Sequence, residues 1–191
     1  MRRTQILTLL FTLLVPIKPS AQTPRPGGAR SAGLKTDIRQ VDFKNLSYNV
    51  NAKLVRMRKG KGEYVSRRDK YESFSANVDK IIYGDLTGDG KDEAAVVVGY
   101  RGSGTGSFND GVIYILKNGR PELLATFKGG DRADGSIADV KIQGGLLIVE
   151  RLAPEAPGVG LCCPEYIDTT RHQWRGSQLV QVGNKQRRRY H

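Results

Sequence analysis

Short apolar runs joined by glycine-containing turns are the feature that most constrains how this chain folds. Asn-Gly and Gly-Gly accept the positive φ angles of tight hairpin turns, so apolar runs on both sides of such a pair indicate two antiparallel strands. Three such pairs follow one another: residues 112–116 and 121–127 around Asn118-Gly119, residues 140–143 and 146–149 around Gly144-Gly145, and residues 169–174 and 179–182 around Gly176-Ser177. Three hairpins in series predict an antiparallel meander.

The rest of the body adds strands and little helix. The apolar run at residues 94–98 suits a central strand, because β-branched residues are favoured where both faces of a sheet are covered. Residues 48–54 alternate between apolar and polar, which predicts one half-buried strand. Residues 37–41 predict a single helical turn, and the polar residues 65–77 leave loop and short helix both open. We therefore expect a mainly β fold, in which an antiparallel meander of hairpins forms a curved sheet or small sandwich.

The beginning of the chain has the pattern of an export signal. Arg2 and Arg3 precede an apolar run at residues 6–15. Small residues follow this run, and we expect cleavage after Ala21. We expect a signal peptide at 1–21, a disordered Pro- and Gly-rich linker at 22–33, one β-rich domain at 34–183 and a basic tail at 184–191. This organisation predicts a secreted or periplasmic protein with no transmembrane segment after signal cleavage.

Positive charge is concentrated at the other end of the chain. The net charge is +12, and four of the basic residues lie in the last seven positions: Lys185, Arg187, Arg188 and Arg189. Such a tail can contact anionic polymers or lipids, or it can be a solvated terminus. Nucleic acid is not the expected partner, because no basic stripe interleaved with aromatic residues is present elsewhere.

One loop has the spacing of a cation site. The loop lies between the apolar residues 81–83 and the run that begins at Ala94. Residues at alternate positions of this loop offer oxygen ligands for a cation: Asp85, Thr87, Asp89, the Lys91 carbonyl and Glu93. Calcium takes six to eight oxygens, and Gly90 permits the sharp bend that turns a backbone carbonyl inward. The spacing predicts a structural Ca²⁺ ion. The other reading is a polar β-turn in which Asp and Gly serve the backbone.

This loop resembles a known calcium motif. An EF-hand does not fit, because its twelfth position would be Val96 and a strand follows. The residues instead resemble the Asp-x-Asp/Asn-x-Asp-Gly-x-x-Asp loop of the FG-GAP/VCBS type. Thr87 stands where that loop has its second Asp or Asn, and Glu93 stands where it has its last Asp. The resemblance implies Ca²⁺ bound by this loop. The body is too short for a β-propeller, so we expect one copy in a smaller β fold.

The chain is also similar to small exported bacterial proteins of the LppP/LprE lipoprotein type. The similarity rests on residues 84–94, the glycine-rich segment after them and the Cys-Cys-Pro at 162–164. The chain departs from that type in lacking a lipid-anchor cysteine. The resemblance implies a fold and an exported location rather than an activity.

The two cysteines, Cys162 and Cys163, are adjacent. Neighbouring cysteines can close a strained vicinal disulfide, and this is the pairing we expect in an oxidising compartment. Intermolecular pairing and two buried thiols are the alternatives. A redox-catalytic pair fits less well, because that motif places two residues between its cysteines.

The sequence names no catalytic residue. His172 is the only internal histidine, and no Gly-x-Ser-x-Gly nucleophile motif is present. We expect a non-enzymatic module that contacts an unidentified envelope or extracellular partner. One alternative is a metal-dependent hydrolase using Asp85, Asp89 and Asp92. The other is a polyanion binder that uses residues 185–191.

Overall fold

A computed structural model describes residues 36–156 and 163–190. Strands dominate these residues, with three short 3-10 segments. In chain order the elements are η1 (Ile38–Gln40), η2 (Phe43–Asn45), β1 (Ser47–Val50), β2 (Lys53–Arg56), β3 (Lys61–Tyr64), η3 (Lys70–Glu72), β4 (Phe74–Gly84), β5 (Glu93–Gly102), β6 (Ser107–Lys117), β7 (Arg120–Phe127), β8 (Ile137–Gln143), β9 (Leu146–Ala153), β10 (Tyr166–Arg175) and β11 (Gln178–Arg189). In the described part of the chain we find no helix with the length and hydrophobicity to cross a bilayer.

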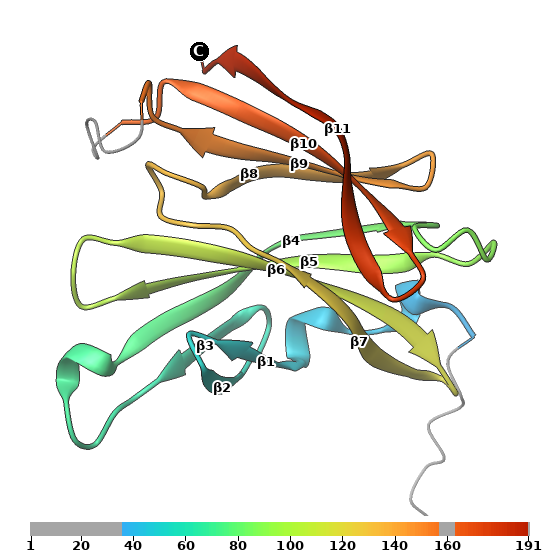
Figure 1. The fold of residues 1–191 in the computed structure, drawn as a ribbon. Coiled ribbons are helices and arrows are strands. Elements are labelled where there is room, and N and C mark those ends of the chain that lie inside the picture. Colours follow the sequence, from blue (N-terminus) through green and yellow to red (C-terminus); the bar gives the residue numbers. More distant parts are fainter. Residues whose placement is uncertain (1–35, 157–162, 191) are drawn as a thin grey trace, which may run out of the picture. The chain divides into compact units, whose positions relative to one another are not determined.

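The strands form two main sheets and a hairpin, and Figure 1 shows them as layers. The middle layer is a five-stranded sheet in the order β3-β4-β5-β6-β7, and the second sheet has the order β11-β10-β9-β8. Strands β1 and β2 form the separate hairpin on the other side. Each pairing is antiparallel. The predicted mainly β, antiparallel fold is confirmed.

Strand β5 is the centre of the described body. Residues 93–99 are all buried, because both faces of this strand are covered. Ala94, Val96 and Val98 belong to a core shared with β1, β2, η1 and η2. Ala95 and Val97 belong to a second core, shared with β8 and β9. The β-branched run at 94–98 is thus explained by burial on two sides.

The three predicted hairpins are present as β6–β7, β8–β9 and β10–β11. Their turn residues have the positive φ angles that the sequence pattern indicates. Asn118 and Gly119 have φ of 51° and 72°, and Gly144 and Gly145 have 58° and 71°. Local turn chemistry therefore sets these pairings.

Residues 48–54 do not form the single strand expected from their alternation. Asn51 and Ala52 have φ of 47° and 58°, so the chain reverses there and β1 pairs with β2. The reversal lets Tyr48, Val50 and Val55 enter one core. In residues 65–77, where loop and short helix were both open, the chain forms η3 and then begins β4.

The boundary predicted at residue 183 is wrong. Strand β11 runs to Arg189 and stays paired with β10, with Arg187 opposite Asp168 and Arg188 opposite Ile167. The reason is that basic residues of this segment form ion pairs with acids on β9 and β10. The signal peptide at 1–21 and the linker at 22–33 lie outside the described residues and remain predictions.

Candidate functional site

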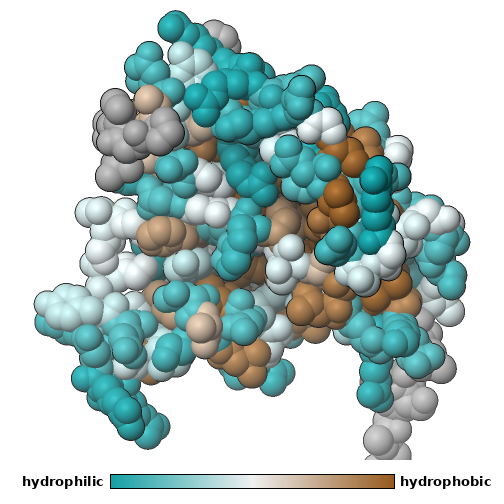
Figure 2. Space-filling model, in the orientation of Figure 1, coloured by the Kyte–Doolittle hydropathy of each residue, from teal (hydrophilic) through white to brown (hydrophobic). Residues whose placement is uncertain are grey.

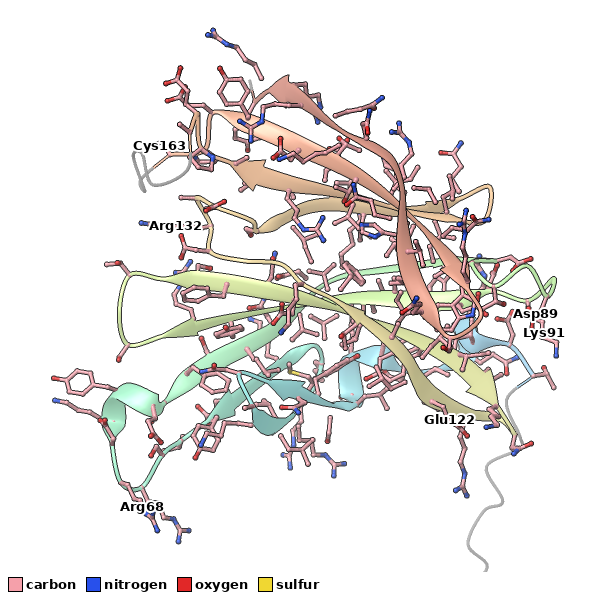
Figure 3. All side chains as sticks on the ribbon, in the orientation of Figure 1. Arg68, Asp89, Lys91, Glu122, Arg132 and Cys163 are labelled. Carbon is pink, nitrogen blue, oxygen red and sulfur yellow. The ribbon has the colours of Figure 1, made fainter. Side chains whose placement is uncertain are left out.

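The predicted cation loop connects two neighbouring strands in the middle of the five-stranded sheet. Strand β4 ends at Gly84 and β5 begins at Glu93, so residues 85–92 form the loop. At Gly84 a Cβ atom would come within 2.7 Å of the Ile142 side chain, so glycine lets the loop start against strand β8. Figure 3 shows Asp89 and Lys91 at the outer tip of the loop.

Glu93 holds the first half of this loop. Its side chain is fully buried. The backbone N–H groups of Leu86 and Thr87 donate to its Oε2 atom at 2.8 and 2.9 Å, and the Thr87 hydroxyl donates to Oε1 at 3.2 Å. Leu86 is buried in the core between the two main sheets. The carboxylate therefore ties the loop to the first residue of β5.

Asp85 and Asp89 hold the second half. The Asp85 carboxylate accepts hydrogen bonds from the backbone N–H groups of Gly88 and Gly90, at 2.7 and 2.9 Å. These two glycines have φ of 80° and 82°, a region that favours glycine. The Lys91 N–H donates to Asp89 at 2.9 Å. Each acid therefore caps backbone groups of its own loop.

Asp92 faces away from this arrangement. The Arg39 guanidinium binds its Oδ2 atom through Nε at 2.7 Å and through a terminal nitrogen at 2.6 Å. The same guanidinium lies 4.8 Å from the centre of the Tyr83 ring. Asp92 thus joins the loop to η1.

The electrostatics of Glu93 are unusual for so buried a group. Burial raises its pKa, the three hydrogen bonds from Leu86 and Thr87 lower it, and the nearby Asp89 raises it again. Within residues 36–156 and 163–190 no Lys, Arg or His side chain forms an ion pair with Glu93. The ionised form therefore lacks a counter-charge.

All the predicted ligands lie in one loop, but their side chains do not converge on one point. Asp85 and Glu93 point at backbone N–H groups. Among the described residues, no group of three or more His, Cys, Asp or Glu side chains is arranged to hold a metal ion. A cation would therefore have to share the carboxylate oxygens of Asp85 and Asp89 with the backbone N–H groups that already donate to them. The Thr87 hydroxyl and the Lys91 carbonyl complete the predicted oxygen set.

An open cavity of about 620 Å³ lies beside the loop. Its polar walls include Asp37, Asp89, Lys91 and Lys117. Both carboxylates and ammonium groups line it, so the hollow has no single sign of charge.

The sequence reasoning missed a charged cluster on the second sheet. Asp168 is mostly buried and accepts hydrogen bonds from Lys185 at 2.7 Å and from Arg187 at 2.7 and 2.9 Å. The Arg187 hydrogen bond is the main reason that the Asp168 pKa is lowered, to about 2. Arg188 likewise bonds Glu150 at 2.9 Å. The sequence feature that could have indicated this cluster is the group of basic residues near the end of the chain.

His172 lies in a group of polar side chains on the second sheet. Its Nε2 atom lies 3.0 Å from the Thr170 hydroxyl, which also accepts a hydrogen bond from Arg151 at 2.9 Å. Burial, and then the positive charge of Arg151, lower the pKa of His172. The imidazole is therefore part of a polar contact network on β9 and β10.

One of the two adjacent cysteines lies within the described residues. Cys163 is exposed, and Cys162 lies outside the described residues. The vicinal disulfide remains a prediction.

Comparison with protein-family models, curated proteins and solved structures gave no match. The described residues thus define the class as an antiparallel β protein of two main sheets, in which a polar loop joins the two central strands.

Proposed function

We propose that the protein is an exported, non-enzymatic interaction module, and that the loop at 85–93 binds a divalent cation, Ca²⁺, as a structural element. The observation that carries the cation is Glu93, a fully buried carboxylate with a raised pKa and with no cationic side chain paired to it among the described residues. Asp85 and Asp89 add two more negative charges within the same loop.

A bound cation resolves this concentration of charge. A buried carboxylate without a counter-charge destabilises the folded state, because the hydrogen bonds it accepts replace only part of its hydration. A divalent ion close to three acids neutralises them and lowers their mutual repulsion. Each carboxylate oxygen can accept more than one contact, so the bonds to backbone N–H groups leave lone pairs for a metal.

Folding and cation binding are coupled in this proposal. The unfolded chain lacks the site, so free Ca²⁺ stabilises the folded state by mass action, by about 2.7 kcal/mol at a concentration one hundred times Kd. For a domain of this size that corresponds to an increase of roughly 5–10 °C in the melting temperature.

Thermal unfolding of the full chain in Ca²⁺ and in chelator tests the proposal. We expect a higher melting temperature in Ca²⁺ for the wild type and a much smaller difference for Asp89→Asn. Glu122→Gln is the control, because Glu122 is an acid on β7 outside the loop and forms an ion pair with Lys117. It should keep the response. Equal melting curves for the wild type in both conditions would contradict the cation.

The structure favours neither alternative function. Lys185, Arg187 and Arg188 are engaged with Asp168 and Glu150, so most of the basic segment is already paired. This disfavours a polyanion binder. The hydrolase alternative used Asp92, whose carboxylate is held by Arg39. We therefore propose neither.

A further inference from the structure

A second groove lies on the face of the five-stranded sheet that the β1–β2 hairpin covers. Its volume is about 480 Å³, within the range of small-molecule sites. The turn at Asn51 and Ala52 forms one wall, and strands β6 and β7 form the other. The groove and the loop at 85–93 share no lining residue. A ligand in this groove would therefore bind independently of the proposed cation.

The groove has an apolar floor. Val112 and Tyr114 lie on β6, and Leu123 lies on β7. Leu123 is 59% exposed, which makes it one of the most exposed large apolar side chains in the described body. An apolar surface left open inside a groove favours a ligand with an apolar face.

The rim carries neutral polar groups. The side chains of Asn49, Asn51 and Thr126 line the groove and, within the described residues, form no hydrogen bond to other protein groups. Each amide offers two donors and an acceptor, and the hydroxyl offers both roles. The rim can therefore both donate to a ligand and accept from it.

The charges in the groove cancel. Asp110 lies 3.7 Å from the Lys128 ammonium and also accepts a hydrogen bond from the Gly129 N–H at 3.1 Å. Burial, and then the negative charge of Asp110, raise the pKa of the Tyr100 hydroxyl, which stays protonated. A groove with this lining suits a neutral ligand better than an anion.

An aromatic row extends from the groove across the sheet. Ring centres are 5.5 Å apart from Tyr64 to Phe74, 5.7 Å from Phe74 to Tyr100, and 5.3 Å from Tyr100 to Phe108. Tyr100 belongs to the groove, and Phe108 is 37% exposed. Phe74 is buried in the core, so the row supports the sheet beneath the groove and only Tyr100 adds to the groove's lining.

The turn that forms one wall is held in an unfavourable conformation. Ala52 has φ of 58°, a region in which its Cβ atom is crowded, and no glycine relieves it. Strained residues of this kind cluster at binding sites, where the surrounding structure holds them. The same conformation makes the two-residue turn between β1 and β2, and it sets this wall of the groove.

We infer that this groove binds a neutral oligosaccharide. A sugar ring has an apolar face of C–H groups and an edge of hydroxyls that both donate and accept. The apolar floor and the Tyr100 ring fit the face, and the amides, Thr126 and Asp110 fit the hydroxyls.

Calorimetric titration of the full chain tests this inference with four probes: cellotetraose, chitotetraose, mannotetraose and, as a charged comparator, tetragalacturonate. We expect at least one neutral probe to bind with Kd of about 1 mM or tighter and the charged probe to bind more weakly. The failure of every neutral probe at this level, or tighter binding of the charged probe, would overturn the inference.

Matched variants place the binding in the groove. Asn49→Ala and Leu123→Ser should each weaken binding by about tenfold, which is about 1.4 kcal/mol. Asn184→Ala on β11 and Val65→Ser after β3 replace exposed residues that do not line the groove, and they should bind as the wild type does. Unchanged affinity in Asn49→Ala and Leu123→Ser would also overturn the inference. Chelator leaves the expected result unchanged, so this test and the cation test fail separately.

Discussion

At the scale of single residues, Glu93 shows how one side chain can serve both a fold and a site. It joins β5 to the loop through Leu86 and Thr87, and its burial raises its pKa. A carboxylate in this position stabilises the loop by hydrogen bonding and destabilises it by charge. A bound cation or a neutral replacement should each remove the second effect.

Glu93→Gln separates these two contributions. The amide oxygen can accept from Leu86 and Thr87 while the NH₂ group donates to the Thr87 hydroxyl, so each hydrogen bond has a substitute. In chelator we expect the variant to be as stable as the wild type or more stable by about 1 kcal/mol, because a buried charge has gone. In Ca²⁺ the wild type should gain stability and the variant should gain less. Urea unfolding in both conditions measures this.

The pH dependence of stability tests the same effect of charge. Because the folded-state pKa of Glu93 is raised, the wild type in chelator should lose stability as pH rises through the range between its ordinary and raised values. Glu93→Gln should lack this loss. A loss of several kcal/mol in chelator from Glu93→Gln would show instead that the ionised carboxylate itself stabilises the loop.

The pKa of Asp168 is shifted in the opposite direction to that of Glu93. Its pKa is lowered to about 2, chiefly by Arg187, so its contribution to stability is complete at neutral pH and is lost as pH falls from about 4 to about 2. Asp168→Asn should lower the free energy of unfolding at pH 7 by about 1 kcal/mol, allowing for solvent around its partners. The difference from the wild type should shrink as the pH approaches 2. A difference that stays constant with pH would contradict the assignment, and Asp134→Asn, an exposed loop acid, is the control.

At the scale of elements, two hairpin turns with positive φ angles differ in one respect. Asn118-Gly119 uses glycine in its second position, whereas Asn51-Ala52 uses alanine at φ of 58°. Alternating apolar residues concealed the second turn, since Ala52 continues the period-two pattern. Turn chemistry that lacks glycine is hard to recognise, because the strain is offset by packing elsewhere.

Exchange of alanine and glycine tests the strain in these turns. Ala52→Gly should stabilise the protein by about 0.5–1 kcal/mol, because glycine adopts positive φ without the Cβ penalty. Gly119→Ala should destabilise it by a similar amount or more. Urea unfolding measures both, and destabilisation by Ala52→Gly would contradict the strained geometry.

At the scale of the whole molecule, the part of the fold that follows from local sequence was predictable. Three turns identified three hairpins, and the run at 94–98 identified the central strand. The order of strands across the sheets and the covering of β5 by β1 and β2 depend on contacts between distant segments. Figure 2 shows the outer end of the second sheet as mostly hydrophilic, and the lack of apolar residues in the last part of β11 is why residues 184–191 were predicted as a tail.

The two candidate sites also differ in how far local sequence predicts them. The loop at 85–93 is one contiguous segment, so its residues could be named from their spacing. The direction of each carboxylate could not, because backbone N–H groups compete with a metal for the same oxygens. The groove combines residues of β1, β5, β6 and β7, which only the folded sheet brings together.

The most direct measurement of the central claim is a calorimetric titration of the purified protein with Ca²⁺, after extensive treatment with chelator. We predict one binding site per chain in the wild type and in Glu122→Gln, and at least tenfold weaker binding in Asp85→Asn and Asp89→Asn, which is about 1.4 kcal/mol each. A wild type that releases no heat with Ca²⁺ at several temperatures, and whose melting temperature does not change, would contradict the claim. The loop at 85–93 would then be a polar turn held by its own hydrogen bonds.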